Sequence, residues 1–330
     1  MRRRDFIGLL GSGVVLPIVP ARAQQGRMRR IGFLSANAET DAHTSQFLDG
    51  FRQGLRENGW IEGRNLTIEF RWTGGDPDRA NAFARELVDL KPDLIVSHTT
   101  PATAVLHRAT SVIPIVFVVV SDPIGNGFVT SLSRPGGNVT GFVNLEASMA
   151  SKWIELAKEV APRLKRIAIL FNPDTAPYAY YEPSIKSAAQ SQSVELVEAA
   201  IHNAADIENT LGRLDLAADG GIVVMPDAST ALQQVYSRII DIAARDRIPA
   251  IYPYRYMANA GGLMSYGTDN GDLFRRAAAY VDRILKGAKP AELPVQLPTK
   301  FEFILNVRTA QLQGFDIPLK LRAFADDVIE

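Results

Sequence analysis

The chain has 330 residues, 46% of them hydrophobic, and its 36 basic side chains balance 36 acidic ones, so the formal net charge is zero. A balanced charge offers no basic surface to nucleic acid or anionic lipid. The sequence contains no cysteine, which excludes disulfides, thiol nucleophiles and a lipid-modified cysteine. The length exceeds what one hydrophobic core usually serves, and this predicts two lobes.

The first 23 residues have the layout of an export signal. Basic residues within 1–7 precede a weakly apolar stretch at 8–20, and Ala-Arg-Ala at 21–23 supplies small residues for cleavage. The adjacent arginines and the glycines that follow favour the twin-arginine route, with the Sec route as the alternative. A membrane anchor is disfavoured because the apolar run is short and contains two prolines. Cleavage after about Ala23 predicts a protein in the periplasm with 32 basic and 35 acidic side chains. We expect this protein to be a monomer.

From residue 28 onward, short β-rich apolar runs alternate with amphipathic stretches of helical length, a pattern typical of parallel sheets covered by helices on both faces. The runs at 93–97 and 113–120 are continuously apolar, as expected for strands buried on both faces. A Gly- and Pro-rich stretch after them predicts the first crossing between lobes. The predicted strands of this half are 30–35, 66–72, 93–97 and 113–120, with helices near 47–58 and 76–88 and the crossing near 122–137.

The second half repeats the alternation. Strands are predicted at 166–171, 194–200, 221–225, 248–252, 262–266 and 301–306, and helices at 153–160, after 183, and at 207–214, 232–245 and 273–285. We therefore predict an α/β fold of two doubly wound parallel-sheet lobes. The first lobe is assigned to 28–143 plus about 255–285, and the second lobe with the hinge to 144–254 plus about 290–330.

Ligands of open parallel sheets bind at the carboxyl ends of the strands, so the residues that follow each strand are the candidates. Thr99 and Thr100 stand just before Pro101, which starts a helix whose free N–H groups attract an anion, and we assign them to a carboxylate. Alternatively, either threonine only caps its own helix. Ser121-Asp122 is likewise compatible with an ordinary turn. The candidates of the first lobe are Ser35, Asn37, His98, Thr99, Thr100, Ser121 and Asp122.

In the second lobe, Asp227 follows a predicted strand and is a candidate partner for a ligand ammonium. The sequence Asp-Ala-Ser-Thr that it begins is an equally good helix cap. Tyrosines gather in the strand-end loops of this half, where a flat ring with a hydroxyl suits stacking on a ligand side chain; some of them are expected to be ordinary surface or hinge residues. The candidates here are Asn172, Tyr180, Asp227, Tyr254 and Tyr266.

Signatures of catalysis are missing from the sequence. Gly262 lies three residues before Ser265 rather than two, so the nucleophile-elbow pattern fails. The four histidines lack metal-ligand spacing, and His98 is of interest only because it ends a central strand. No phosphate-binding loop of the Walker type occurs. We expect no enzyme activity, no catalytic residue, no metal and no cofactor.

Five ordered motifs resemble a known family, the periplasmic substrate-binding components of ABC transporters, in the subfamily that includes tryptophan- and tyrosine-binding members. They are TPATA at 100–104, SDPIGNG at 121–127, SRPGGNVTG at 133–141, GLMSYG at 262–267 and LNVRTA at 305–310. The resemblance implies a type I periplasmic binding fold, with two lobes joined by three crossings. It also implies that Thr100, Ser121 and Asp122 line the first-lobe wall, with Asn172, Asp227 and Tyr266 near the second lobe or hinge.

As a function, the resemblance implies capture of a small carboxylate-bearing solute between the lobes and its delivery to an ABC permease in the inner membrane. We expect an amino acid, or an aromatic or branched acid, with Thr100 and Ser121 on its carboxylate, Asp227 on its amine and Tyr180 or Tyr254 on its side chain. The alternatives are a ligand-sensing subunit for a membrane sensor and, further off, an exported two-lobe enzyme. A regulator's effector domain is disfavoured because the export signal and mildly acidic charge do not suit DNA binding.

Overall fold

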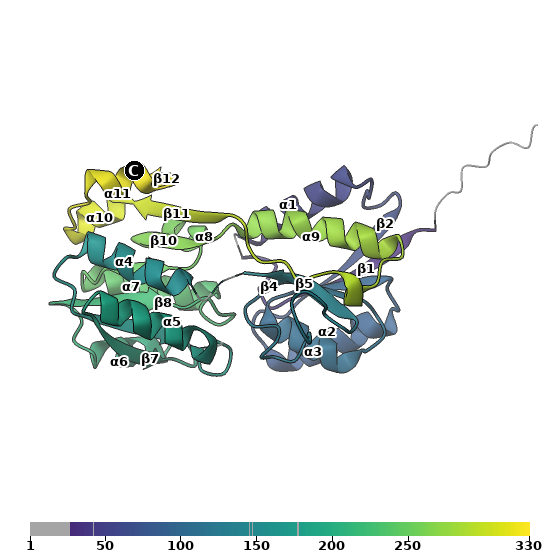
Figure 1. Ribbon diagram of the computed structural model, residues 1–330, viewed down its shortest axis with the longest axis horizontal. Helices are drawn as coiled ribbons and strands as arrows, with labels where there is room; N and C mark the ends of the chain where they lie inside the picture. The colour runs from purple at the N-terminus through teal and green to yellow at the C-terminus, as the bar shows by residue number, and fades with distance from the viewer. Residues whose placement is uncertain (1–26, 42, 145, 147, 177) are drawn as a thin grey trace, which may run out of the picture.

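The computed structural model describes residues 27–41, 43–144, 146, 148–176 and 178–330, and the predicted export signal lies outside them. The described residues form two α/β lobes, each built on its own sheet, that lie end to end along the long axis of the molecule (Figure 1). Within this part of the chain, no helix has the length and apolar character that a bilayer crossing requires.

The first sheet has the strand order β2-β1-β3-β4-β5, and every pairing in it is parallel. Successive β1 side chains alternate between its two faces: Ile31 and Phe33 enter the apolar cluster beneath α1 and α9, whereas Leu34 enters the cluster beneath α2 and α3. The elements are β1 (Arg29–Ser35), α1 (Thr44–Glu57), β2 (Leu66–Trp72), α2 (Pro77–Asp89), β3 (Leu94–His98), α3 (Thr100–Ala109), β4 (Ile115–Val120), β5 (Val139–Val143) and α9 (Asn270–Leu285).

The second sheet has the order β12-β11-β10-β9-β8-β6-β7 and is parallel except where β10 meets β11. Its strands are β6 (Arg166–Phe171), β7 (Glu195–Ala200), β8 (Gly220–Val224), β9 (Ala250–Tyr252), β10 (Met264–Thr268), β11 (Phe301–Asn306) and β12 (Asp327–Ile329). The helices around it are α4 (Met149–Val160), α5 (Tyr178–Ser191), α6 (Asp206–Gly212), α7 (Gln233–Arg245), α8 (Arg255–Asn259), α10 (Val307–Gln313) and α11 (Leu319–Phe324). Two helix-covered, mainly parallel sheets confirm the predicted fold class.

Helix α9 returns from the second lobe to pack along α1 on the first (Figure 1). Glycine permits this close approach, because a Cβ atom at Gly50 would lie 2.8 Å from the carbonyl oxygen of Gly271. The chain therefore passes between the lobes after β5, after β10 and before β11.

Two stretches lie in a different lobe from the one expected. Residues 255–268 belong to the second lobe, because β10 pairs with β9 and β11. The segment that begins with the 3₁₀ turn η1 (Pro290–Glu292) stays on the first lobe: the backbone N–H of Val143 donates to the Gln296 carbonyl oxygen at 3.0 Å, and the Thr140 hydroxyl donates to that of Leu293 at 2.6 Å. The pattern of apolar residues identifies an element but not the sheet that it packs on or joins. This is why both stretches were assigned to the wrong lobe.

Candidate functional site

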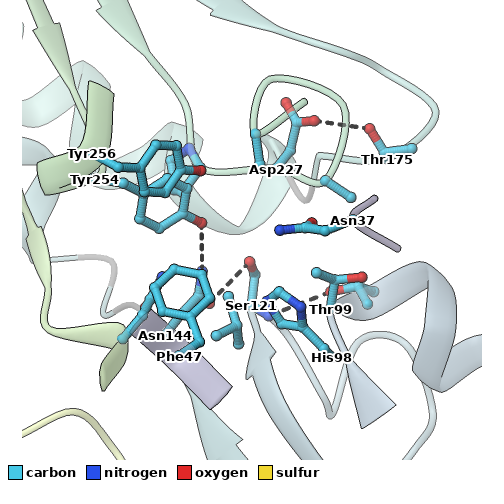
Figure 2. Close-up of a pocket in the computed structure, with 16 residues that line it drawn as sticks. Asn37, Phe47, His98, Thr99, Ser121, Asn144, Thr175, Asp227, Tyr254 and Tyr256 are labelled. Carbon is cyan, nitrogen blue, oxygen red and sulfur yellow. Dashed lines mark hydrogen bonds between the residues drawn. The ribbon is translucent and has the colours of Figure 1, made fainter. Parts of the chain in front are cut away.

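A cavity lies between the lobes, where the carboxyl ends of β1, β3 and β4 face those of β8 and β9. About 410 Å³ of space lies between its lining atoms, and this figure includes space open to solvent. Figure 2 shows polar side chains of the first lobe opposite Asp227 and two tyrosines of the second. The predicted residues that line this cavity are Asn37, His98, Thr99, Thr100, Ser121, Asp227 and Tyr254.

The backbone at the first-lobe edge of the cavity is strained. Thr99 has φ of +82° and Val119 has φ of +62°, a region that side chains with a Cβ branch rarely adopt. Val119 also lies at an irregularity in the pairing of β4 with β5. Both residues line the cavity, and strained backbone of this kind clusters at ligand sites because the surrounding structure must hold it in place.

Two buried histidines support this first-lobe wall. The Ser35 hydroxyl lies 2.9 Å from Nδ1 of His98, and Nδ2 of Asn37 lies 2.8 Å from Nε2 of His43. Burial lowers the pKa of His98 to about 3 and that of His43 to about 4, so both rings are neutral near pH 7. Ser35 does not line the cavity; it orients His98 from behind.

Asp227 shapes its own loop mainly through one of its carboxylate oxygens. Its Oδ1 accepts hydrogen bonds from the backbone N–H of Ser229 at 2.6 Å and of Thr230 at 3.0 Å, and from the Thr175 hydroxyl at 3.1 Å. Its Oδ2 accepts one long bond, 3.3 Å, from the N–H of Asn172. Burial raises the pKa of Asp227, while these hydrogen bonds oppose the increase. The capping role is therefore present, and Oδ2 retains capacity for a further donor.

Aromatic rings form the remaining wall of the cavity (Figure 2). The rings of Tyr254 and Tyr256 stack with centroids 5.4 Å apart, and Phe47 meets Tyr256 edge-on at 6.4 Å. Burial raises the pKa of both tyrosines, so their hydroxyls stay protonated. Rings of this kind suit an apolar or aromatic ligand side chain.

The two lobes touch each other around the cavity. The His43 imidazole of the first lobe lies face to face with the Tyr256 ring of the second, with centroids 3.9 Å apart and planes at 10°. In the hinge, Nδ2 of Asn144 donates to the Tyr254 hydroxyl at 3.3 Å. These contacts join the two lobes beside the cavity.

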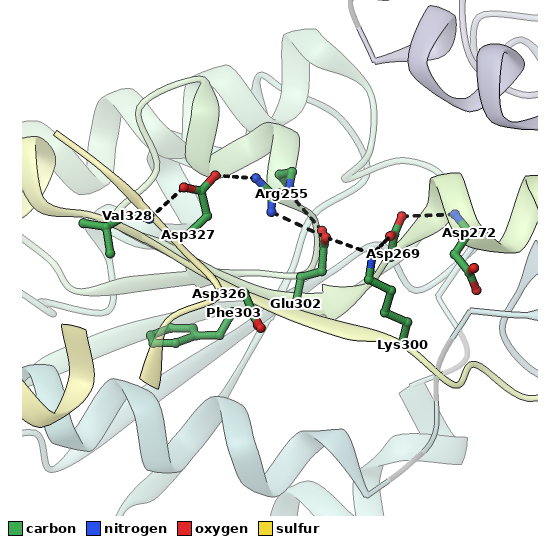
Figure 3. Close-up of polar contacts among 9 residues, drawn as sticks. All are labelled: Arg255, Asp269, Asp272, Lys300, Glu302, Phe303, Asp326, Asp327 and Val328. Atoms are coloured by element: carbon green, nitrogen blue, oxygen red, sulfur yellow. Dashed lines mark hydrogen bonds and ion pairs between the residues drawn. The ribbon is translucent and has the colours of Figure 1, made fainter. Parts of the chain in front are cut away.

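An ion-pair network links two of the hinge crossings beside the cavity (Figure 3). Lys300, just before β11, lies 2.6 Å from the carboxylate of Asp269, which precedes α9. In the same network, the Arg255 guanidinium pairs with the carboxylates of Glu302 and Asp327. The nitrogen–oxygen distances are 2.9 and 2.6 Å. The network ties the crossings to the second sheet.

Several predicted residues do not line the cavity. Asp122 closes its own turn by accepting a bond from the Gly125 N–H at 2.8 Å. Asn172 reaches the site only through its backbone N–H, while its side-chain amide donates to the His202 carbonyl oxygen at 3.2 Å. Both residues fold a loop at the cleft without exposing their side chains to the cavity.

Two of the predicted tyrosines point elsewhere. Tyr180 is 42% exposed and packs edge-on against Tyr181 at 4.9 Å. Tyr266 stacks on Phe301 at 6.3 Å, and its carbonyl oxygen accepts a bond from Nε1 of Trp153 at 2.8 Å. Tyr266 therefore serves the packing of the second lobe.

The cavity also contains residues that were not predicted. Phe47 and Tyr256 lie on helices, and no strand-end rule selects them. Asn144 and Asn270 follow β5 and β10 closely, so the strand-end rule could have found them. The other lining residues missed by sequence reasoning are Val119, Thr175 and Ala231, whereas Pro226 and Ala228 flank the predicted Asp227 in the same strand-end stretch. Among the described residues, no group of three or more His, Asp or Glu side chains is placed to hold a metal ion.

Two lobes around a polar and aromatic cavity define a solute-binding architecture. Known proteins with similar sequences and folds agree with this class. The family model described as "ABC transporter substrate binding protein" matches residues 35–329, and the chain belongs to this family. Its relatives are binding proteins, and the chain is not an enzyme.

Three relatives illustrate the similarity. A tyrosine-binding protein of Clostridioides difficile (strain R20291) is 27% identical over 260 residues, 79% of this chain and 74% of the relative. The structure of an ABC domain in complex with L-Trp from Streptococcus pneumonia has 27% identity and a TM-score of 0.83, covering 91% of this chain and 99% of that one. A ligand-free, open substrate-binding protein from Clostridium difficile has 25% identity and a TM-score of 0.69, covering 92% and 99%.

Proposed function

We propose that the chain is the periplasmic solute-binding component of an ABC importer, and that it encloses one amino acid with an aromatic or branched side chain in the cavity between its lobes. A permease in the inner membrane is the partner. The observation that carries the proposal is the sorting of the cavity walls: hydroxyls and a helix start on one side, a carboxylate opposite, and aromatic rings beside them. An amino acid presents the three matching groups.

The carboxylate is assigned to Thr99, Thr100 and Ser121. All three line the cavity where α3 begins, and the helix start adds free N–H groups and a favourable dipole. The Thr99 hydroxyl is buried without a hydrogen-bond partner, which leaves it available to a ligand. No Lys or Arg is among the lining residues of this cavity in the described part of the chain, so neutral donors and the helix start carry the interaction.

The ammonium group is assigned to Asp227 and Asn37. Oδ2 of Asp227 accepts only one long hydrogen bond, and Oδ1 of Asn37 is buried without a partner. Figure 2 draws Asn37 between Asp227 and the first-lobe hydroxyls. A positively charged amine in this position replaces missing hydrogen bonds and compensates the buried carboxylate.

The ligand side chain is assigned to Phe47, Tyr254 and Tyr256 in place of the exposed Tyr180. Closure of the lobes completes this wall, since Phe47 comes from the first lobe and the tyrosines from the second. The proposal is supported by the stack of His43 on Tyr256 and by the higher TM-score with the L-Trp complex than with the open relative.

Isothermal titration calorimetry of the purified mature protein against the twenty amino acids tests the proposal. We expect saturable binding of one aromatic or branched amino acid per chain. Native mass spectrometry of freshly purified protein supplies a second readout, because a co-purified ligand adds its own mass. If no amino acid binds, or if a bound compound is steadily turned over, the proposal is wrong.

A further inference from the structure

Asn270, the first residue of α9, carries a buried polar group that nothing in the fold engages. Its side chain lines the cavity, the residue is only 7% exposed, and its Oδ1 has no hydrogen-bond partner. Capping of α9 does not require it, because Oδ1 of Asp269 already accepts a bond from the N–H of Asp272 at 3.1 Å. Buried carbonyl oxygens without partners are rare because desolvation without compensation is unfavourable. The amide therefore points to a donor supplied from outside the chain.

The position of Asn270 places it at the aromatic wall. Phe274 lies one helical turn further along the same face of α9, and its ring stacks on that of Phe47 with centroids 5.6 Å apart and planes at 9°. Phe47 in turn meets Tyr256. A ligand whose carboxylate lies at Thr99 and whose ring lies at Phe47 and Tyr256 thus presents its side chain to Asn270.

We propose that Asn270 determines specificity by accepting a hydrogen bond from a donor on the ligand's ring, an indole N–H or a phenolic O–H. This inference rests on the proposed function and deepens it: among apolar amino acids, the protein selects those whose ring bears a donor. The discrimination arises because a ligand without the donor fills the same space but leaves the buried carbonyl of Asn270 unpaired.

Matched ligands test the inference without altering the protein. Calorimetry compares L-Tyr with L-Phe, and L-Trp with the analogue in which sulfur replaces the indole N–H. Whichever of L-Tyr and L-Trp binds more tightly decides the relevant pair. In that pair, we expect the ligand without the donor to bind about 10- to 100-fold more weakly. Equal affinities within both pairs overturn the inference and leave the proposed function intact. Failure of all four ligands, with another amino acid bound or none, shows that the ring-donor assignment is wrong, and the wider panel then decides the proposed function.

Variants assign the effect to Asn270. Asn270→Leu, close in size, is expected to bring the paired affinities within about threefold of each other, whereas Asn270→Asp keeps an acceptor and keeps the preference. The matched control is Asn209→Leu at an exposed position of α6, which should leave both affinities unchanged. If Asn270→Leu weakens both members of a pair equally, the residue has only a structural role and the inference fails. Thermal unfolding of each variant verifies folding, and the ligand pairs decide the question even if Asn270→Leu does not fold.

Discussion

The two walls of the cavity are built on different principles. The first-lobe wall carries partly unsatisfied groups on strained backbone: Thr99 has positive φ and an unpaired hydroxyl, and Asn37 has an unpaired carbonyl oxygen. On the second lobe, Asp227 is held by four hydrogen bonds and the tyrosine rings stack on each other. The first-lobe wall therefore has polar groups free to pair with a ligand, whereas most groups of the second-lobe wall already have partners within the protein.

This difference suggests an order of events. The first lobe contains buried polar groups without partners, and we infer that a ligand which pairs them binds there first. In the proposed function, the second lobe then closes as a preformed surface, and adds Asp227 and the rings with little rearrangement.

The largest effect is expected from Asp227→Asn, which removes charge from the completed wall while preserving its shape. Calorimetry should show affinity for the cognate amino acid reduced by about 100-fold or more, because the ligand's buried ammonium loses its charged partner. Unfolding should change much less, since Asn can still accept the capping bonds. An affinity within threefold of the unmodified protein would show that the amine lies elsewhere.

A smaller effect is expected from Thr100→Ala on the first wall. Losing one neutral donor to a carboxylate should weaken binding about 10- to 50-fold. The control is Thr110→Ala at the opposite end of α3, where the hydroxyl accepts bonds from the N–H groups of Val112 and Ile113. The control should lower the melting temperature without changing affinity. Unchanged affinity in Thr100→Ala defeats the carboxylate assignment.

Acid should weaken the contact between the two walls. In the closed form burial lowers the pKa of His43 to about 4, and exposure on opening returns it toward its usual 6.5. The closed form therefore binds fewer protons between these values, so affinity is constant above about pH 7 and falls as the pH decreases toward 4. At pH 5.5 the loss should be about 10-fold.

His43→Phe keeps a ring against Tyr256 but removes the titrating group, so calorimetry between pH 5 and 8 should give a flatter profile for this variant. His98, Asp41 and Asp227 lie on or near the same site and contribute any residual slope. A profile identical to that of the unmodified protein would rule out His43 as the sensor.

The smallest effect is expected in the hinge, outside both walls. Lys300 is 58% exposed in its pair with Asp269, and pairs of this kind contribute little. Lys300→Met should change affinity by about twofold, and the difference should vanish at high salt because screening removes it from both proteins. A tenfold change would show that the hinge network, and not the cavity, sets the closure equilibrium.

The sequence predicted the architecture and the first wall better than the second. Strand-end residues such as Thr99 and Ser121 reach the cavity because parallel strands direct their carboxyl ends to one edge. The same rule selected Tyr266, but β10 continues to Thr268, so Tyr266 lies within the strand and not at its end. Phe47 and Tyr256 enter from helices on opposite lobes, and only tertiary packing brings them together.

The lobe boundaries illustrate a second limit. Local patterns identified β10 and α9 as elements, but which sheet β10 joins depends on pairing between residues far apart in sequence. Positive φ at Thr99 and Val119 also had no sequence signal, because neither residue type favours that conformation. Strain of this kind is visible only once the fold is built.

A crystal structure of the protein loaded with its tightest-binding amino acid tests the account most directly. We predict a single ligand between the lobes, with its carboxylate against Thr99, Thr100 and Ser121 and its amine against Asp227 and Asn37. A ligand outside the cavity, or one whose carboxylate lies against Asp227, would contradict the account.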